Sequence, residues 1–175
     1  MNDSDESRFL QAVSEFCNLE RTGAAGYTAE SYSLARMAPL AALVGHPERS
    51  LRILHVAGTK GKGSTCHFAA ALLASAGIRA SLFTSPHAVA FQERIEISGR
   101  PVGYGELLAQ IERFQHALAQ ATVPRPQLFE VLTVVALRIF ADAGCTHAIL
   151  ETGIGGALDA TNFIERPLAC AITPI

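Results

Sequence analysis

Apolar and polar positions along the chain follow two patterns. Segments in which apolar residues recur every three or four positions predict helices, whereas short apolar runs bounded by turn residues predict strands. Helices are predicted at residues 8–19, from Ser31 or Ser33 to 44, 65–76, 104–121 and 127–143, the last apolar nearly all round and therefore buried. Strands are predicted at residues 51–57, 79–83, 146–150 and 168–173, with a small hairpin at 94–102 around a turn at 98–101.

The order of these segments predicts the fold class. Strands that alternate with helices are typical of an α/β protein with a doubly wound, mostly parallel sheet. Residues 1–50 form a helical N-terminal segment in this interpretation, and residues 51–175 form the α/β core. Ligands on such sheets bind beyond the carboxyl ends of the strands. The three unusual loops of the sequence, residues 58–64, 84–94 and 151–162, all leave those ends, which makes them the predicted site.

Composition narrows the class of protein. The chain has 175 residues, of which 49% are hydrophobic and 17% charged, so one domain with a sizeable core is expected rather than disorder. A net charge of −2 without clustered basic residues argues against a nucleic-acid surface. The N-terminus is polar and acidic, unlike a signal peptide, and no apolar stretch reaches the ~18 residues of a membrane helix. We therefore expect a soluble, cytoplasmic protein whose four cysteines are reduced and structural.

A glycine-rich run between the first strand and the following helix reads Gly58-Thr59-Lys60-Gly61-Lys62-Gly63-Ser64. Strand, glycine-rich turn with a lysine, then helix is the order of a phosphate-binding P-loop. Glycines let backbone N–H groups approach phosphate oxygens, the helix N-terminus favours negative charge, and the lysine adds a cation. The run departs from the commonest P-loop, because Gly63 separates Lys62 from Ser64. A glycine-rich turn without a ligand is the alternative, but the surrounding elements favour a nucleotide triphosphate.

Polar residues in the three loops could complete this site. Glu151 ends an apolar strand, from which a carboxylate can hold Mg²⁺ directly or through water, although it could also be a surface acid or a helix cap. Ser64 could offer its hydroxyl to Mg²⁺ or cap the following helix. Ser85, in Ser85-Pro86-His87, gains interest only from its place among the three loops.

Two further polar positions lie in apolar surroundings. Glu130 and Thr133 share one face of the apolar helix 127–143, and a buried carboxylate needs a partner, for which Arg138 is a candidate. His55 lies inside a strand and is interpreted as a core histidine.

Taken in order, these motifs resemble the folylpolyglutamate synthase/dihydrofolate synthase family, a branch of the Mur-ligase superfamily. The resemblance covers nearly the whole chain, with Lys60 where asparagine is more usual. The segments that carry it are His55–Ser64, Thr84–His87 with Phe91 and Glu93–Ile95, Phe129-Glu130 with Thr133, Glu151–Gly156, Leu158–Asn162, and Leu34, Arg36-Met37, Gly45 and Pro47 near the N-terminus.

The resemblance implies a reaction. Such enzymes use MgATP to phosphorylate the carboxylate of a pteroate or folate, and the amine of L-glutamate then attacks the acyl phosphate to give an amide. The implied cofactors are ATP and Mg²⁺, the implied partners are small molecules only, with no nucleic acid and no membrane, and the implied assembly is a monomer.

The resemblance also implies roles for individual residues. Gly58, Thr59, Lys60, Gly61, Lys62, Gly63 and Ser64 bind ATP, with Lys62 and Glu151 as the catalytic pair. Ser85 and Glu151 bind Mg²⁺, with Ser64 as a further candidate from the P-loop itself. The residues that contact the pteroate are Gln127, Leu128, Phe129, Glu130, Leu158, Asp159 and Ala160.

The resemblance corresponds to the N-terminal part of such an enzyme, about the first two-fifths. The sheet is therefore expected to be incomplete, and the family's C-terminal domain is not represented in the sequence. Two other functions stay open at this point: another P-loop protein such as a small-molecule kinase, which usually has lysine directly before the serine or threonine, and a nucleotide-binding remnant without catalysis.

Overall fold

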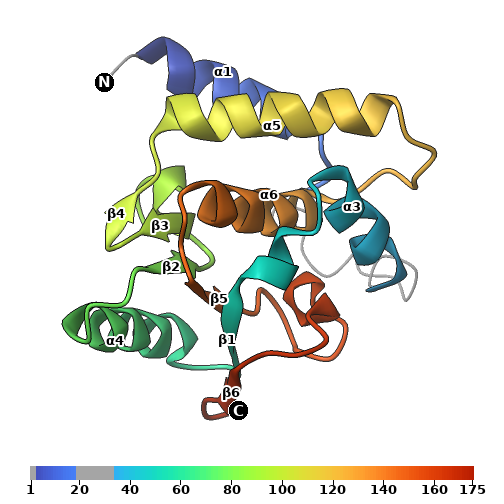
Figure 1. The fold of residues 1–175 in the computed structure, drawn as a ribbon. Helices are drawn as coiled ribbons and strands as arrows, with labels where there is room; N and C mark the ends of the chain where they lie inside the picture. The colour runs from blue at the N-terminus through green and yellow to red at the C-terminus, as the bar shows by residue number, and fades with distance from the viewer. Residues whose placement is uncertain (1–2, 19–33) are drawn as a thin grey trace.

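A mixed β-sheet organises the chain (Figure 1). The structure is a computed structural model that describes residues 3–18 and 34–175. The strands are β1 (Arg52–Ala57), β2 (Ala80–Phe83), β3 (Ile95–Ile97), β4 (Arg100–Pro101), β5 (His147–Glu151) and β6 (Ala169–Ile172). The α-helices are α1 (Asp3–Ser14), α3 (Met37–Leu43), α4 (Lys62–Ser75), α5 (Tyr104–Ala119) and α6 (Leu128–Asp142). Short 3₁₀ helices are η2 (Leu34–Arg36), η3 (Pro47–Ser50), η4 (Phe91–Arg94) and η5 (Ala160–Phe163).

The strand order within the described residues is β4-β3-β2-β5-β1-β6. The strands β2, β5, β1 and β6 are parallel, and β3 and β4 extend the sheet as an antiparallel hairpin. The predicted mostly parallel α/β sheet is thus confirmed. The hairpin turn is tighter than predicted, because Ser98 and Gly99 both have positive φ and a two-residue turn of that kind returns at once to the strand. The return strand therefore begins at Arg100 rather than at Val102.

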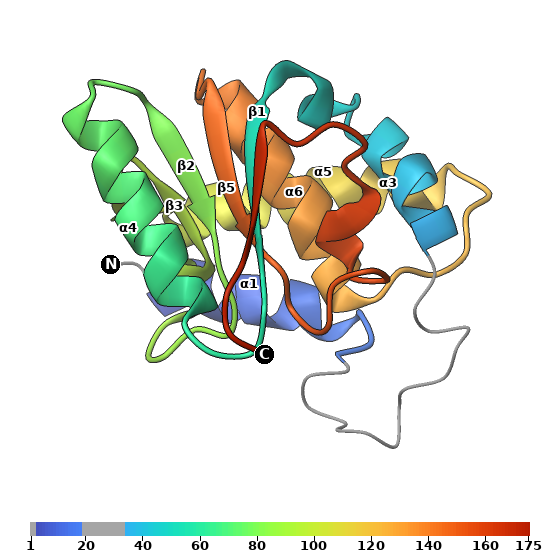
Figure 2. The same cartoon turned by 90° about the horizontal axis from the view of Figure 1, so that it is seen from below.

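Helices cover both faces of this sheet (Figures 1 and 2). Helix α4 lies alone on one face, α6 lies on the other, and α1 and α5 pack together beyond α6. Helix α6 is buried along nearly its whole length, as its apolar sequence predicts. The smaller core beneath α4 is formed by Val56, Cys66, Leu82 and Ile149.

Two element boundaries differ from the sequence prediction, and a third cannot be compared. Helix α1 begins at Asp3 instead of residue 8, with Asp5 and Glu6 in its first turn, where acidic side chains favour a helix. Helix α4 begins at Lys62, three residues earlier than predicted. The serines predicted to cap the second helix, Ser31 and Ser33, lie outside the described residues.

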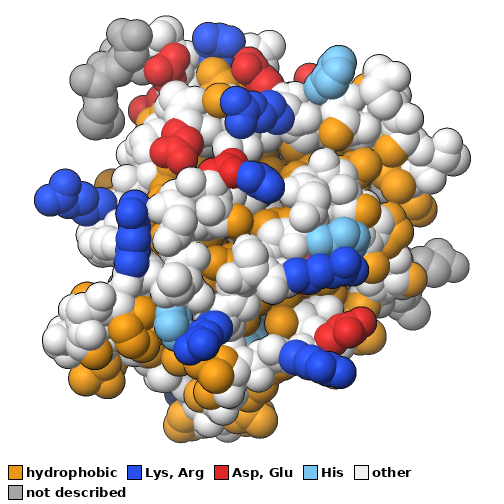
Figure 3. Space-filling view, in the orientation of Figure 1, with side chains coloured by type: hydrophobic (Ala, Val, Ile, Leu, Met, Phe, Trp, Pro, Cys, Tyr) orange, Lys and Arg blue, Asp and Glu red, His pale blue; other side chains and the backbone are white. Residues whose placement is uncertain are grey.

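The surface carries exposed apolar side chains at one edge of the molecule. Phe68 and Leu72 of α4 are 71% and 69% exposed, and Ile172 of β6 is 75% exposed. Figure 3 shows apolar atoms gathered along the lower edge, where α4 and β6 lie in Figure 1, while charges of both signs are scattered above. Within residues 3–18 and 34–175, no helix has the length and apolar character to cross a membrane.

Candidate functional site

The phosphate loop is a turn of four residues between β1 and α4. Gly58 and Gly61 both have positive φ, +132° and +81°, which bends the chain back so that α4 starts directly at Lys62. The amides of the first helical turn therefore point out of the helix end, where an anion would be favoured. Ser64 is exposed inside this turn and Gly61 occupies the cap position, so the alternative in which Ser64 caps the helix is wrong.

The chain end after β6 holds the first half of this loop. The amides of Thr59 and Lys60 donate to the carbonyl oxygen of Pro174 at 3.0 and 3.2 Å, and Thr173 donates its amide and its hydroxyl to Ala57. A Cβ on Gly58 would lie 2.1 Å from Thr173 Oγ1 and 2.7 Å from its carbonyl oxygen. Gly58 is thus required by close backbone approach as well as by its φ angle.

Three predicted site residues meet beside the loop. Glu151 Oε2 accepts a hydrogen bond from the Ser85 amide at 3.1 Å, and Glu151 Oε1 lies 4.0 Å from Lys62 Nζ. Burial raises the pKa of the Glu151 carboxyl, although the Ser85 amide and the Lys62 ammonium oppose that shift. Residues from three separate loops therefore converge on one carboxylate, as the sequence predicts.

This cluster has the oxygen chemistry that Mg²⁺ prefers. Within the described ranges, no group of three or more His, Cys, Asp and Glu side chains could hold a metal ion. A magnesium ion is commonly bound through one or two carboxylates, with phosphate oxygens and water completing its octahedron. Glu151 offers one such carboxylate, and the hydrogen bond from the Ser85 amide places Ser85 beside it.

Comparison with known proteins identifies relatives of this chain. No family model matches the chain. It is 42% identical over 146 residues to the dihydrofolate synthase/folylpolyglutamate synthase of Bacillus subtilis, which covers 81% of this chain and 34% of that protein. It is 41% identical over 153 residues to the protein of the same name from Mycobacterium tuberculosis, covering 82% of this chain and 31% of that protein. The chain belongs to the folylpolyglutamate synthase/dihydrofolate synthase family.

Solved structures of the family share the fold. Mycobacterium tuberculosis folylpolyglutamate synthase complexed with ADP matches 98% of this chain with a TM-score of 0.82 at 33% identity, and the match covers 37% of that structure. A folylpolyglutamate synthase complex with AMPPCP and folate matches 95% of this chain with a TM-score of 0.82 at 28% identity and is covered to 39%. The chain thus spans about a third of the length of these two bacterial relatives.

In the present chain, the segment Gln127–Glu130 forms the start of α6. The Glu130 side chain accepts from the Gln127 amide at 2.8 Å, which makes a capping box. Arg36 donates to Glu130 Oε1 from Nε at 3.0 Å and from Nη2 at 2.8 Å, so the buried carboxylate is paired across the chain. The expectation that Arg138 pairs with Glu130 is wrong, because Arg138 bonds Asp142 one turn farther along the same helix.

The other predicted pteroate residues differ in how much surface they offer. Leu158 is 54% exposed, whereas Asp159 and Ala160 are 3% and 9% exposed. Leu128 is buried but lines a cleft, described below.

Phe129 is half-buried, and the centre of its ring lies 5.5 Å from that of Phe83. The ring also packs on Gly153, where an added Cβ would lie 2.8 Å from Phe129 Cζ. Among the predicted pteroate residues, Leu158 therefore offers the most accessible apolar side chain.

The loop 84–94 is organised by residues whose function the sequence pattern does not reveal. Glu93 accepts hydrogen bonds from the amides of Ala88, Val89 and Ala90 at 2.7–3.3 Å, and these bonds hold the pKa of its carboxyl below the ordinary value. Arg94 is buried and donates from Nε to His87 Nδ1 at 2.9 Å. No local signal marks Glu93, because Ala90 at the cap position of η4 lacks the side-chain oxygen of a capping-box sequence.

A cleft opens beside this loop and does not include Glu151 in its lining. Its volume is about 820 Å³, and its walls include Pro86, His87, Phe91, Arg94, Tyr104 and Leu128. The cleft therefore joins the Ser85-Pro86-His87 segment to the start of α6, two of the segments that the family resemblance assigns to metal and pteroate.

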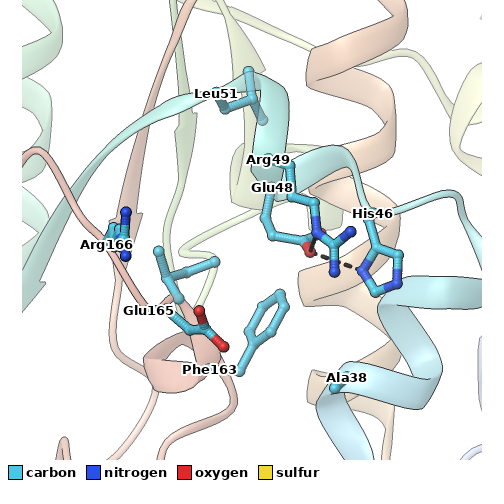
Figure 4. A pocket seen from close by; sticks show the side chains of 9 residues that line it. Ala38, His46, Glu48, Arg49, Leu51, Phe163, Glu165 and Arg166 are labelled. Carbon is cyan, nitrogen blue, oxygen red and sulfur yellow. Dashed lines mark hydrogen bonds and ion pairs between the residues drawn. The ribbon is translucent and has the colours of Figure 1, made fainter.

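A second cavity lies at the opposite end of the strands. It has a volume of about 330 Å³ and is walled by η3 and by residues 163–166, which precede β6 (Figure 4). His46 Nδ1 is 2.9 Å from Glu48 Oε1, while Glu48 Oε2 is buried without a hydrogen-bond partner in the described part of the chain. A water molecule in this cavity would satisfy that oxygen. The cavity shares no wall residue with the phosphate loop.

Proposed function

We propose that this chain is the nucleotide-binding part of an ATP-dependent amide ligase that adds L-glutamate to a pteroate or folate. One observation carries the proposal: Lys62, Glu151 and Ser85 converge at a phosphate loop in a chain 42% identical to a dihydrofolate synthase/folylpolyglutamate synthase. A carboxylate oxygen of the pteroate or folate attacks the γ-phosphorus of ATP, and ADP leaves. The amine of L-glutamate then attacks the acyl phosphate, phosphate leaves, and the amine loses a proton.

The phosphate loop contributes charge and amide donors to the first step. The amides of Thr59 and Lys60 are engaged by Pro174, so the phosphate contacts fall to the amides at the start of α4 and to the Lys62 ammonium. Lys62 lies beside Glu151 without a tighter bond and can turn towards a phosphate. Preorganised donors of this kind stabilise the charge that develops on the transferred phosphoryl group.

Glu151, Ser85 and Ser64 would hold the magnesium ion. When bound, Mg²⁺ neutralises phosphate charge and orients the γ-phosphoryl group. The Ser85 amide fixes the rotamer of Glu151, so the carboxylate is positioned before the nucleotide arrives.

The substrate carboxylate is proposed to approach from the side of α6 and the 151–162 loop. Leu128 lines the larger cleft, Phe129 and Leu158 offer apolar surface, and Gln127, Glu130, Asp159 and Ala160 hold the backbone that presents them. The expected partners are small molecules, the expected state is a monomer, and the expected location is the cytoplasm.

Isothermal titration of the 175-residue chain with ATP, with and without Mg²⁺, tests the nucleotide site. We expect saturable binding of MgATP that weakens about tenfold or more when EDTA removes the metal. A kinase and a ligase differ in the second ligand, so dihydropteroate and a hydroxyl-bearing sugar are titrated in parallel. Absence of nucleotide binding would contradict the proposal, and binding of the sugar in place of dihydropteroate would favour the kinase.

A further inference from the structure

We propose that His55 is a positioning residue for the substrate loop, acting through Thr161 on Asp159. The inference rests on the proposed function, because that function assigns Leu158–Ala160 to the pteroate. It goes beyond the interpretation of His55 as a core histidine, since it gives the imidazole a defined partner and a consequence for binding.

A chain of buried hydrogen bonds carries the proposal. His55 Nε2 lies 2.7 Å from Thr161 Oγ1, and Thr161 Oγ1 donates to Asp159 Oδ1 at 2.6 Å. The Thr161 amide donates to the same Asp159 oxygen at 2.9 Å, and the Ile154 amide donates to Asp159 Oδ2 at 2.9 Å. The three side chains are 7%, 0% and 3% exposed. Both carboxylate oxygens are therefore satisfied by the loop itself.

The direction of donation fixes the proton on the imidazole. Because the single hydroxyl proton of Thr161 goes to Asp159, Thr161 Oγ1 must accept from His55, which requires a proton on Nε2. Burial lowers the pKa of His55, although the Asp159 charge opposes that shift, so the imidazole is neutral at pH 7. A neutral donor and a charged acceptor, joined by one hydroxyl, make a network whose members are all partnered.

The network joins two parts of the site that are far apart in the sequence. His55 lies on β1, on the strand that runs directly into Gly58 and the phosphate loop. Asp159 lies between Leu158 and Ala160 and also holds the Ile154 amide, so it closes the loop from both sides. The position of Leu158 relative to the phosphate loop is thus set by one line of hydrogen bonds. A histidine that only filled core volume would not need Thr161 and Asp159 in this order.

Matched substitutions separate positioning from simple packing. Thr161→Val removes the hydroxyl at constant volume, whereas Thr161→Ser keeps it. His55→Leu removes the donor, and His55→Gln retains an N–H at the end of a side chain of similar reach. Ser81→Ala removes another buried hydroxyl, which donates to the His147 carbonyl away from the loop, and serves as the structural control.

Two readouts are measured on the 175-residue chain: the affinities for MgATP and dihydropteroate by titration calorimetry, and hydrogen exchange of the Ile154 amide. We expect Thr161→Val and His55→Leu to weaken dihydropteroate binding about tenfold, to change MgATP affinity less than about threefold, and to speed exchange at Ile154. We expect Thr161→Ser to stay near wild type, His55→Gln to recover part of the loss, and Ser81→Ala to move neither readout.

Each outcome decides one question. Wild-type affinity and wild-type exchange at Ile154 in Thr161→Val would overturn the positioning role. If the unsubstituted chain binds MgATP but no dihydropteroate, the assignment of the substrate fails, while exchange at Ile154 still tests whether His55 and Thr161 fix the loop. If His55→Leu does not fold, the Thr161 pair gives the answer alone.

Discussion

At the scale of single residues, Lys62 and Glu151 form a loose pair that a nucleotide can separate. Their charged atoms are 4.0 Å apart, and the Lys62 side chain is 15% exposed, so the ammonium is near the carboxylate without being locked to it. A phosphate group offers Lys62 a stronger partner, and Mg²⁺ offers one to Glu151. Binding of MgATP would exchange one weak ion pair for two stronger interactions.

Replacing Lys62 tests this exchange. In Lys62→Ala, MgATP affinity should fall about 10- to 100-fold, the scale of a charged hydrogen bond. Lys60→Ala is the matched control, because Lys60 belongs to the same loop, is exposed, and presents only its amide, to Pro174. Calorimetric titration of both variants should show the larger loss in Lys62→Ala. The reverse order would mean that Lys60 is the phosphate-binding lysine.

Replacing Glu151 gives a prediction about pH. Its folded-state pKa is raised above the ordinary 4.5, so the folded protein favours the protonated carboxyl, and the stability that this group contributes is lost as pH rises through the folded-state pKa. Glu151→Gln removes that loss. Its melting temperature should equal the wild-type value near about pH 4 and match or exceed it near about pH 8, while the Mg²⁺ dependence of ATP binding weakens.

Thermal melts across this range, with calorimetry at the upper end, check the Glu151 prediction. A variant that melts several degrees below wild type at about pH 8, and that still needs Mg²⁺ to bind ATP, would show that Glu151 is a structural residue.

At the scale of elements, the junction of β1, α4 and the chain end after β6 depends on glycine. Gly58 combines a φ of +132° with direct contact to the Thr173 backbone, whereas Gly77, just after α4, has a φ of +73° and no neighbour within 4 Å of a Cβ. The two positions therefore separate the effect of backbone strain from the effect of steric overlap.

Alanine at these two glycines should have unequal effects. Gly77→Ala is expected to lower the free energy of unfolding by about 1 kcal/mol, the cost of a left-handed conformation. Gly58→Ala should lower it by a further 1–3 kcal/mol or so, because the Thr173 backbone must move. Urea denaturation of both variants measures the difference. If both variants lose the same free energy of unfolding, the Thr173 backbone moves away from the added methyl group without an energetic cost.

Most elements could be predicted from the sequence, since apolar periodicity reports which face of a segment is buried. That argument reaches β1, β2, β5 and the buried α6, whereas β6 is an apolar run whose four residues are all exposed. It does not reach contacts between distant positions. The pair Arg36–Glu130 and the bond from Thr59 to Pro174 depend on how elements pack, and no local pattern contains that information.

The same limit applied to the site. The convergence of Ser85 and Glu151 followed from the rule that parallel strands end at one edge of a sheet. The role of Glu93 was missed because its three amide partners face it only after the loop has folded. The start of α4 at Lys62 was missed because Gly63, the residue directly after Lys62, argues against a helix, and the turn geometry overrides that propensity.

At the scale of the whole molecule, the chain matches 31–34% of the length of the Bacillus subtilis and Mycobacterium tuberculosis relatives. Its described residues bring one carboxylate and two serines to the phosphate loop and contain no three-residue metal cluster. A ligase must also hold a second substrate and exclude water from an acyl phosphate.

The 175-residue chain is therefore expected to bind MgATP without forming an amide. Incubation with ATP, Mg²⁺, L-glutamate and either dihydropteroate or a reduced folate, followed by chromatography of the products, should give glutamylated product at the background level. A full-length relative supplies the positive control. Robust turnover by the purified chain would show that the remaining length of the relatives is dispensable for catalysis.

The bonds from Thr59 and Lys60 to Pro174 have a consequence for synthesis in the cell. A nascent chain leaves the ribosome from its N-terminus, so the phosphate loop emerges while the strand that will hold it has not yet been translated. Until Thr173 and Pro174 are synthesised, the amides of Thr59 and Lys60 lack the carbonyl oxygen that they bond in the folded chain. The loop therefore completes its hydrogen bonding only after Thr173 and Pro174 have been synthesised, so its final geometry forms late in translation.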